Sequence, residues 1–291
     1  MRVTNKIIAT QIKDTISQNA QRLQKSQFAI ASGRRFNKPS DDPIGTTQAI
    51  KQRIRIDRIN QINRNIDDGL GFLNLTDTVL GGVRSQLVRA KEIALAQTSG
   101  TANASDRALA AKEVAVILED VVALANTEFN GRFIFAGRKT QNKPFNLEGA
   151  VVTYHGDDGS IQRQIGFDET IQTNVTGSEV FAKTFETLIN LKETLEQNNR
   201  AGIEATLAEL DANIESILTI QSDVGAKVNR LETQKERLLD SKMELTQILS
   251  DTEDVDLAEA IMEFSLKQTA LQAALESAAR IIQPSLLNFL R

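Results

Sequence analysis

The chain has no cysteine and no tryptophan, and its 291 residues include one histidine, one tyrosine and four prolines. The missing cysteines exclude disulfide bonds, thiol catalysis and cysteine-based zinc sites. A single histidine excludes multi-histidine metal sites and leaves few groups for acid–base chemistry. We therefore expect a protein without enzymatic activity, with no catalytic residues, no bound metal and no cofactor.

No apolar stretch approaches the roughly 18 residues that a membrane-spanning helix requires. The opening residues, Met1–Lys6, lack the apolar core of a cleaved secretion signal. The chain carries 34 Lys and Arg against 38 Asp and Glu, for a net charge of −4. This balance argues against a nucleic-acid-binding protein. We expect neither membrane insertion nor nucleic-acid binding.

Long helices are predicted on both sides of a short irregular region. Residues 44–143 and 145–283 contain no proline, so the strongest helix breaker is absent from both tracts. An apolar heptad pattern over 203–249 is typical of a coiled-coil seam. Its polar positions, Gln221, Lys235 and Lys242, are expected to set the register or to lie where the seam reaches solvent. Ser40, Asp41 and Asp42 precede Pro43 as a helix cap, and the pattern after them predicts a helix over 43–98. A third helix is expected after Ser105-Asp106, and a short one over 182–197.

A small β-rich region interrupts these helices. Seven of the sixteen glycines and seven of the twelve phenylalanines lie between 129 and 185. Residues 151–155 and 161–167 flank a Gly-Asp-Asp-Gly-Ser turn, a pattern that predicts a β-hairpin, and 131–137 is a further candidate strand. The predicted fold is mainly α, a long coiled-coil helical rod built from the N- and C-terminal halves, with a small β-rich insert. Three domains are predicted, comprising 1–42 with 255–291, 43–130 with 182–254, and 131–181.

Each end of the chain predicts one amphipathic helix that cannot bury its apolar stripe alone. The economical arrangement pairs the two helices with each other. A narrow pair of helices still exposes apolar surface, so we expect neighbouring subunits to cover the remainder. The candidate assembly residues are Ile12, Ile16, Leu23, Ile30, Leu271, Leu275, Ile282 and Phe289.

Other candidate sites have simpler explanations. Residues 34–64 contain eight Lys and Arg, which favours a solvated helix face, with an inter-subunit electrostatic contact as the alternative. Asp41 and Asp42 are adjacent and precede proline, so a cap explains them better than a glycosidase carboxylate pair. His155 ends a predicted strand and is expected to be an ordinary surface or half-buried residue.

Three motifs together resemble the flagellin superfamily of bacterial flagella. They are Ser-Gly-Arg-Arg-Phe-Asn-Lys-Pro-Ser-Asp-Asp-Pro at 32–43, Arg-Ala-Lys-Glu-Ile-Ala-Leu-Ala-Gln at 89–97 and Asn-Gly-Arg-Phe-Ile-Phe-Ala-Gly at 130–137. The first and third are more narrowly similar to the hook-associated protein 3 family, the hook–filament junction proteins. The ending at 284–291 is similar to flagellins as well and does not separate the two.

The resemblance implies a structural protein that forms a junction ring, joining the hook to the flagellin filament through axial packing of its terminal helices. It implies four partners, namely other copies of the chain, hook-associated protein 1, flagellin and a flagellar type III export chaperone that covers the C-terminal helix. It further implies export without a cleaved signal and an extracellular location on the flagellum. Two alternatives stay open. One is a short flagellin, and the other is an adhesin whose insert binds a surface glycan or receptor through Tyr154 and nearby phenylalanines.

Overall fold

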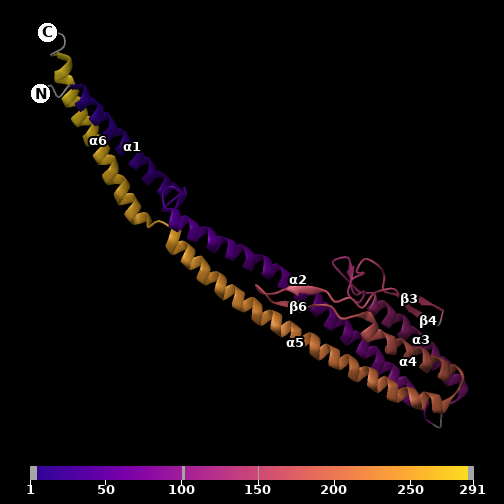
Figure 1. Cartoon of the computed structure of the whole chain (residues 1–291). Helices are drawn as coiled ribbons and strands as arrows, with labels where there is room; N and C mark the ends of the chain where they lie inside the picture. The colour runs from indigo at the N-terminus through magenta and orange to yellow at the C-terminus, as the bar shows by residue number, and fades with distance from the viewer. Residues whose placement is uncertain (1–4, 100–101, 150, 288–291) are drawn as a thin grey trace. The chain divides into compact units, whose positions relative to one another are not determined.

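The computed structural model describes residues 5–99, 102–149 and 151–287, and it is mainly helical (Figure 1). None of the helices in these ranges is long and apolar enough to cross a membrane. The described residues divide into two compact units, one from 1–58 and 241–291 and the other from 59–240. The helices are α1 (Asn5–Ser32), α2 (Pro43–Gln97), α3 (Ala104–Ala125), α4 (Gly177–Glu196), α5 (Arg200–Glu253) and α6 (Leu257–Leu287).

The predicted coiled-coil seam of α5 is present in the unit formed by 59–240. One residue in seven is fully buried along it, and each of these side chains is at most 5% exposed. Buried residues of α2 at helical spacing supply the opposing surface, and α2 keeps nearly the predicted bounds. The seam residues are Ile203, Leu210, Ile217, Val224, Leu231 and Leu238, and their counterparts on α2 include Ile59, Ile62, Ile66, Leu73, Leu80 and Leu87.

Polar residues within this seam bind across it. The Gln221 amide donates to the Asp77 backbone carbonyl at 3.3 Å and to its carboxylate at 3.1 Å. Lys235 forms an ion pair with Asp67 at 2.7 Å. Both pairs are exposed, so these polar positions lie where the seam reaches solvent, one of the two predicted explanations. Their role in setting the register stays a prediction.

The start of α3 was predicted wrongly. The cap is Asn103 rather than Ser105-Asp106, because the Asn103 side chain accepts from the Asp106 amide at 2.9 Å and Asp106 accepts from the Asn103 amide at 3.2 Å. This reciprocal capping box satisfies two backbone donors that a helix start leaves free. Helix α4 also begins before the predicted residue 182, since the Gly177 amide donates to the Phe135 carbonyl at 3.0 Å.

The β-rich insert contains three short antiparallel strand pairs within the described residues. The predicted hairpin between 151–155 and 161–167 is wrong, because the two segments pair with other strands instead of with each other. The candidate strand over 131–137 is limited to Arg132–Phe133. The pairs are β1 (Glu128–Phe129) with β2 (Arg132–Phe133), β3 (Phe145–Glu148) with β4 (Val151–Tyr154), and β5 (Gln162–Gln164) with β6 (Thr170–Gln172).

Asp157 explains why the expected turn does not form. Its carboxylate accepts hydrogen bonds from the amides of Arg138 at 2.6 Å and Gly159 at 3.1 Å, and these bonds lower the pKa of the Asp157 side chain. The Tyr154 hydroxyl donates to the Asp157 carbonyl at 2.9 Å. The segment is therefore held against residues 136–138 instead of closing a tight turn between β4 and β5.

Aromatic side chains form the core of the insert and attach it to α4. The Phe145 ring lies 4.9 Å from Tyr154, 5.3 Å from Phe181 and 5.2 Å from Phe185, centroid to centroid. Burial raises the pKa of the Tyr154 hydroxyl. The insert belongs to the same compact unit as α3 and α4. The predicted division into three domains stays a prediction.

Gly137 provides a test of the close contact between residues 137 and 157 of the insert. Its φ is +64°, and a Cβ there would lie 1.9 Å from the Asp157 carbonyl oxygen. Gly131 also has a positive φ, +72°, but nothing lies within 4 Å of its Cβ position. Gly131→Ala should destabilise the insert by about 1 kcal/mol through backbone strain alone. Gly137→Ala should destabilise it by about 1–3 kcal/mol more through the clash.

Hydrogen exchange over residues 131–181 measures both glycine variants against the parent chain. The expected result is clearly faster exchange in the Gly137 variant than in the Gly131 variant. Equal exchange rates in the two variants would contradict the proposed close contact with Asp157.

Candidate assembly interface

The motif at 32–43 folds back on the end of α1. Gly33 has a φ of +69°, the left-handed conformation that commonly ends a helix. The Ser32 hydroxyl donates to the Phe28 carbonyl at 2.8 Å and accepts from the Asn37 side-chain amide at 3.0 Å. The Phe36 side chain is buried. The motif is therefore an ordered connector between α1 and α2.

The adjacent acids of this connector have separate structural roles. The Asp42 carboxylate accepts from the Gly45 amide at 2.8 Å and caps α2, which begins at Pro43 as predicted. The Lys25 ammonium donates to the Asp41 carboxylate at 2.8 Å, and this hydrogen bond lowers the pKa of Asp41. These contacts confirm the cap and account for both carboxylates without catalysis.

A second connector, between α5 and α6, lies directly against the first. The Arg35 amide donates to the Glu253 carbonyl at 2.7 Å, and the Val255 amide donates to the Gly33 carbonyl at 3.0 Å. Arg34 and Asp254 form an antiparallel β-bridge between these two bonds. Two segments more than 200 residues apart in sequence are thus joined through their backbones.

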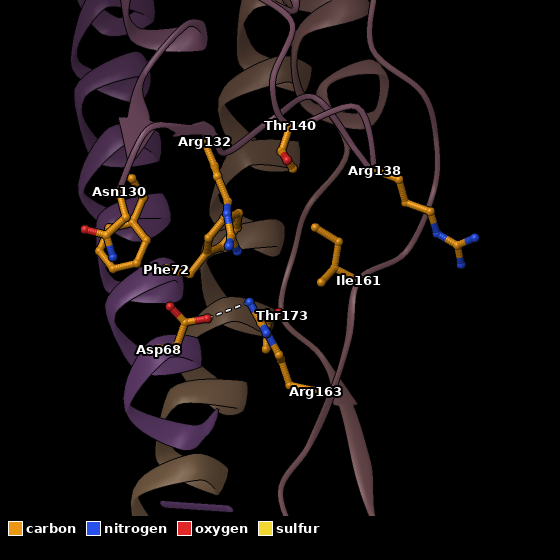
Figure 2. Close-up of a pocket in the computed structure, with 10 residues that line it drawn as sticks. Asp68, Phe72, Asn130, Arg132, Arg138, Thr140, Ile161, Arg163 and Thr173 are labelled. Atoms are coloured by element: carbon orange, nitrogen blue, oxygen red, sulfur yellow. Dashed lines mark ion pairs between the residues drawn. The ribbon is translucent and has the colours of Figure 1, made fainter. Parts of the chain in front are cut away.

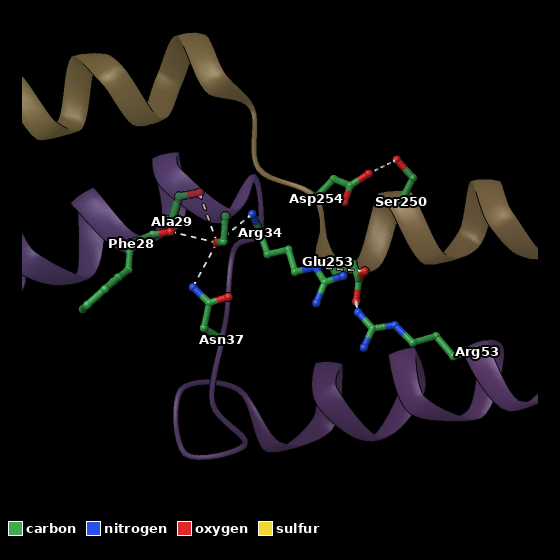
Figure 3. A network of polar contacts seen from close by, with 9 residues as sticks. Phe28, Ala29, Arg34, Asn37, Arg53, Ser250, Glu253 and Asp254 are labelled. Atoms are coloured by element: carbon green, nitrogen blue, oxygen red, sulfur yellow. Dashed lines mark hydrogen bonds and ion pairs between the residues drawn. The ribbon is translucent and has the colours of Figure 1, made fainter.

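A buried carboxylate completes this joint (Figure 3). The Glu253 side chain is 8% exposed and contacts two guanidinium groups, those of Arg34 at 3.5 Å and of Arg53 in α2 at closer range. Both arginines remain partly exposed, so water still solvates them while the carboxylate is sequestered. Breaking a buried ion pair is costly because it leaves a charge without compensation. We call residues 32–36, Arg53 and 253–255 the connector joint.

The sequence did not predict the role of Glu253. Residues 34–64 were expected to be a solvated face or an inter-subunit contact, yet Arg34 and Arg53 bind within the chain and Arg35 lies 3.6 Å from Asp42. The available signal was the acidic run at 251–256, opposite in charge to Arg34 and Arg35. Charge alone could not identify Glu253 as the partner of the arginines, because the other acids of this run carry the same charge.

Helices α1 and α6 lie side by side and run antiparallel (Figure 1). Near the joint, the Lys267 ammonium donates to the Ser26 hydroxyl at 3.1 Å. Farther along, Ile12 and Ile16 line the same crevice as Ala274 and Ala278. The two ends of the chain therefore pair as the amphipathic patterns predicted.

The candidate assembly residues differ in exposure. On α1 they are half-buried, as is Leu271 on α6, whereas Leu275 is 49% exposed. Ile282 lies in α6 with its side chain outside the described part of the structure, and Phe289 lies outside the described residues. The half-buried residues of α1 are Ile12, Ile16, Leu23 and Ile30. The assembly role of this set stays a prediction.

The pair of terminal helices buries small side chains most completely, leaves some large apolar side chains half-buried and exposes others. Its most buried residues are Ser26, Ala260 and Ala278. Leu275, a predicted assembly residue, is exposed together with Leu257 and Ile261, because the stripe of α6 with the buried residues runs through Ala260 and Ala278. Among the described residues of α1 and α6, the large apolar side chains that are at least 49% exposed are Ile7, Phe28, Leu257, Ile261, Met262, Leu266 and Leu275. We call these seven residues the uncovered apolar surface.

The insert offers little support for the adhesin alternative. A crevice of about 210 Å³ lies where it meets α2, but Arg163 there is paired with Asp68 at 2.5 Å, and Phe129 packs edge-on against Phe72 (Figure 2). Small-molecule sites are usually larger, from about 300 Å³ upward. Tyr154, the expected sugar platform, is part-buried, and its single hydroxyl hydrogen is shared between the Asp157 carbonyl at 2.9 Å and the Phe135 carbonyl at 3.1 Å.

Comparisons with known proteins place the chain in a family. The model of the bacterial flagellin N-terminal helical region matches residues 3–140, and that of the C-terminal helical region matches 207–290. Together they cover well over half of the chain. The chain belongs to the flagellin superfamily. The predicted fold class and the predicted resemblance are therefore confirmed.

Individual members of the flagellin superfamily match over nearly their whole length. Flagellar hook-associated protein 3 of Salmonella typhimurium is 26% identical, covering 94% of this chain and 95% of the relative. The flagellin of Bacillus subtilis is 26% identical, covering 94% of each. The crystal structure of the flagellar junction protein FlgL from Legionella pneumophila has the same fold, with a TM-score of 0.60 at 17% identity over 72% of this chain and all of that one. The chain is a structural flagellar protein, and the junction role fits these relatives best.

The connector joint can be tested at Glu253. Glu253→Gln keeps the shape of the side chain but removes the charge that both arginines share, which should destabilise the joint by about 2 kcal/mol. The amides of Arg35 and Val255 should then exchange with solvent roughly thirtyfold faster. Glu263→Gln is the matched control, because it removes an exposed i,i+4 pair with Lys267 and should change exchange by about twofold or less. Equal effects of the two variants would contradict the joint.

Proposed function

We propose that this chain forms the junction ring that joins the flagellar hook to the flagellin filament. The observation that carries the proposal is the uncovered apolar surface of α1 and α6. Covering a half-exposed leucine, isoleucine or methionine contributes about 1 kcal/mol. Six such residues and Phe28 on two helices supply enough driving force for several copies to associate, while a single copy leaves them exposed.

The partners follow from the family rather than from a contact within this chain. Within the ring, the terminal helices of other copies would pack along the flagellar axis and cover the uncovered apolar surface. On either side of the ring, hook-associated protein 1 and flagellin would present similar terminal helices. Before assembly, an export chaperone would cover α6, because an exposed amphipathic helix binds readily to an apolar groove. The protein would leave the cell through the flagellar type III channel without a cleaved signal and act outside it, with no catalytic step.

Leu275 tests the assembly surface. Leu275→Asp should leave the helix content of the purified chain unchanged, because this side chain is half-exposed in the monomer. It should block incorporation into flagella, since burying an unpaired carboxylate in an inter-subunit contact costs several kcal/mol. Thr269→Asp is the control, because it places the same charge at another exposed position of α6. Circular dichroism and quantification of the protein in isolated flagella measure the two effects.

Location distinguishes the junction protein from a short flagellin. Immunogold labelling of intact flagella should show one band next to the hook. Labelling along the whole filament would favour the flagellin alternative, and incorporation of the Leu275 variant at the parental level would contradict the proposed assembly surface. Binding of the intact protein to a glycan array would instead favour the adhesin alternative.

A further inference from the structure

Charge is strongly separated between the two segments that meet at the connector joint. Residues 15–40 contain five cationic side chains and no Asp or Glu. Residues 243–266 contain seven acidic side chains and no Lys or Arg. The cations are Arg22, Lys25, Arg34, Arg35 and Lys38, and the acids are Glu244, Asp251, Glu253, Asp254, Asp256, Glu259 and Glu263. One copy therefore has a cationic segment and an acidic segment in the same compact unit.

The cationic segment forms a groove with an aromatic side chain in it. The groove has a volume of about 430 Å³ and lies between α1 and the connector at 35–41. Phe28 lines it and is 57% exposed. Lys25 and Arg35 line it too, each already paired with an acid of the connector. Lys38 also lines the groove and has no ion pair among the described residues. The groove thus combines an apolar contact with an uncompensated positive charge.

The acidic segment has a matching flank at the start of α6. Glu259, Met262 and Leu266 follow helical spacing, at i, i+3 and i+7, and so share one side of the helix. Met262 is 62% exposed and Leu266 is 71% exposed. Glu259 is exposed and has no ion pair among the described residues, whereas Glu263 is paired with Lys267. This flank combines two large apolar side chains with a carboxylate that forms no ion pair among the described residues.

Within one copy, the acidic end of the flank lies beside the groove, since Glu259 lines a crevice together with Lys25 and Arg35. The large apolar side chains of the two surfaces point elsewhere. Phe28 lies two residues after the buried Ser26, and two residues along a helix turn a side chain to nearly the opposite face. Phe28 therefore points away from α6. By the same argument Met262, two residues after the buried Ala260, points away from α1. A contact between Phe28 and Met262 therefore requires a second molecule.

We propose that the groove of one copy receives the Glu259–Met262–Leu266 flank of a second copy. Lys38 pairs with Glu259, and Phe28 packs against Met262, a contact that sulfur and aromatic rings favour. Each copy provides one groove and one flank. In the proposed ring the groove of each copy receives the flank of the next, so the contact is heterologous and repeats from copy to copy. Opposite charge also sets the orientation, because two grooves or two flanks would repel each other. This inference rests on the proposed ring function and identifies a surface within it.

Cross-linking tests whether the two surfaces meet. The chain has no cysteine, so Lys38→Cys and Glu259→Cys each introduce one unique thiol. Cells that produce both single variants together are treated with a bismaleimide, because the Cα atoms of an ion pair are usually too far apart for a disulfide. Isolated flagella should then yield covalent dimers containing one copy of each variant. Pairing Lys13→Cys with Glu259→Cys is the control, since Lys13 is an exposed cation of α1 outside the groove.

Dimers from the Lys38 and Glu259 pair no more abundant than those from the Lys13 control would overturn the proposal. That result leaves the junction function intact if immunogold still shows one band next to the hook. Absence of the band from flagella of the parent chain would instead contradict the proposed function itself.

Charge reversal provides a second, independent test. Lys38→Glu and Glu259→Lys should each reduce incorporation about tenfold, because each places like charges opposite one another. Both changes in one chain restore an opposite pair at every contact and should recover most of the loss. Lys13→Glu should have little effect. Failure of the double variant to recover incorporation, with the helix content of each variant unchanged, would contradict the pairing of Lys38 with Glu259.

Discussion

The connector joint is the constraint on which the paired ends of the chain depend. α1 and α6 are separated by most of the sequence. The most buried residues of their contact are serine and alanine, which contribute little apolar area, and the larger apolar residues there are only half-buried. Two backbone hydrogen bonds and a sequestered carboxylate hold their near ends together. Because both connectors are short and ordered, the helices that leave them start in a fixed relation. The pairing of the ends therefore needs little hydrophobic energy of its own.

Because the connector joint holds α1 and α6 together, large apolar side chains on these helices remain available for other contacts. If leucine and isoleucine filled the interface between α1 and α6, the pair would be more stable but would have less surface for neighbours. Here the small residues face inward, and Leu257, Ile261 and Leu275 remain half-exposed. A monomer with such a surface is soluble only when that surface is limited or covered. The structure of the monomer is thus consistent with a protein that is stable enough to persist and completed by assembly.

Repetition made the helices predictable, and single long-range contacts made the rest unpredictable. The seam of α5 repeats every seven residues, so errors at one position do not obscure it, and the cap before Pro43 uses local chemistry. The insert lacks such repetition. Its strand pairing depends on one carboxylate, Asp157, that captures two amides, and a local turn pattern cannot reveal this. Glu253 was missed for the same reason, since its arginine partners come from distant parts of the chain.

The stripe on α6 shows a different limit of sequence patterns. Leu257, Ile261 and Leu275 follow a heptad as well as any buried seam does, and yet the stripe that faces α1 runs through Ala260 and Ala278. A heptad indicates that a surface needs a partner, but it does not say whether the partner belongs to the same chain. Two adjacent stripes, one small and one large, are expected of a helix that contacts both its own chain and its neighbours.

The family matches separate the helical ends of the chain from most of the insert. They cover residues 3–140 and 207–290 and leave 141–206 between them, which holds β3 to β6 and α4. The core of the insert contains Phe145 and Tyr154, packed with Phe181 and Phe185 of α4. Its side chains therefore need to fit only one another and the helices they contact. The terminal helices must pack against each other and, in the proposed ring, against every neighbouring copy at the same time. A surface with several simultaneous partners tolerates few changes, whereas a self-contained core can be rebuilt with different side chains of similar volume.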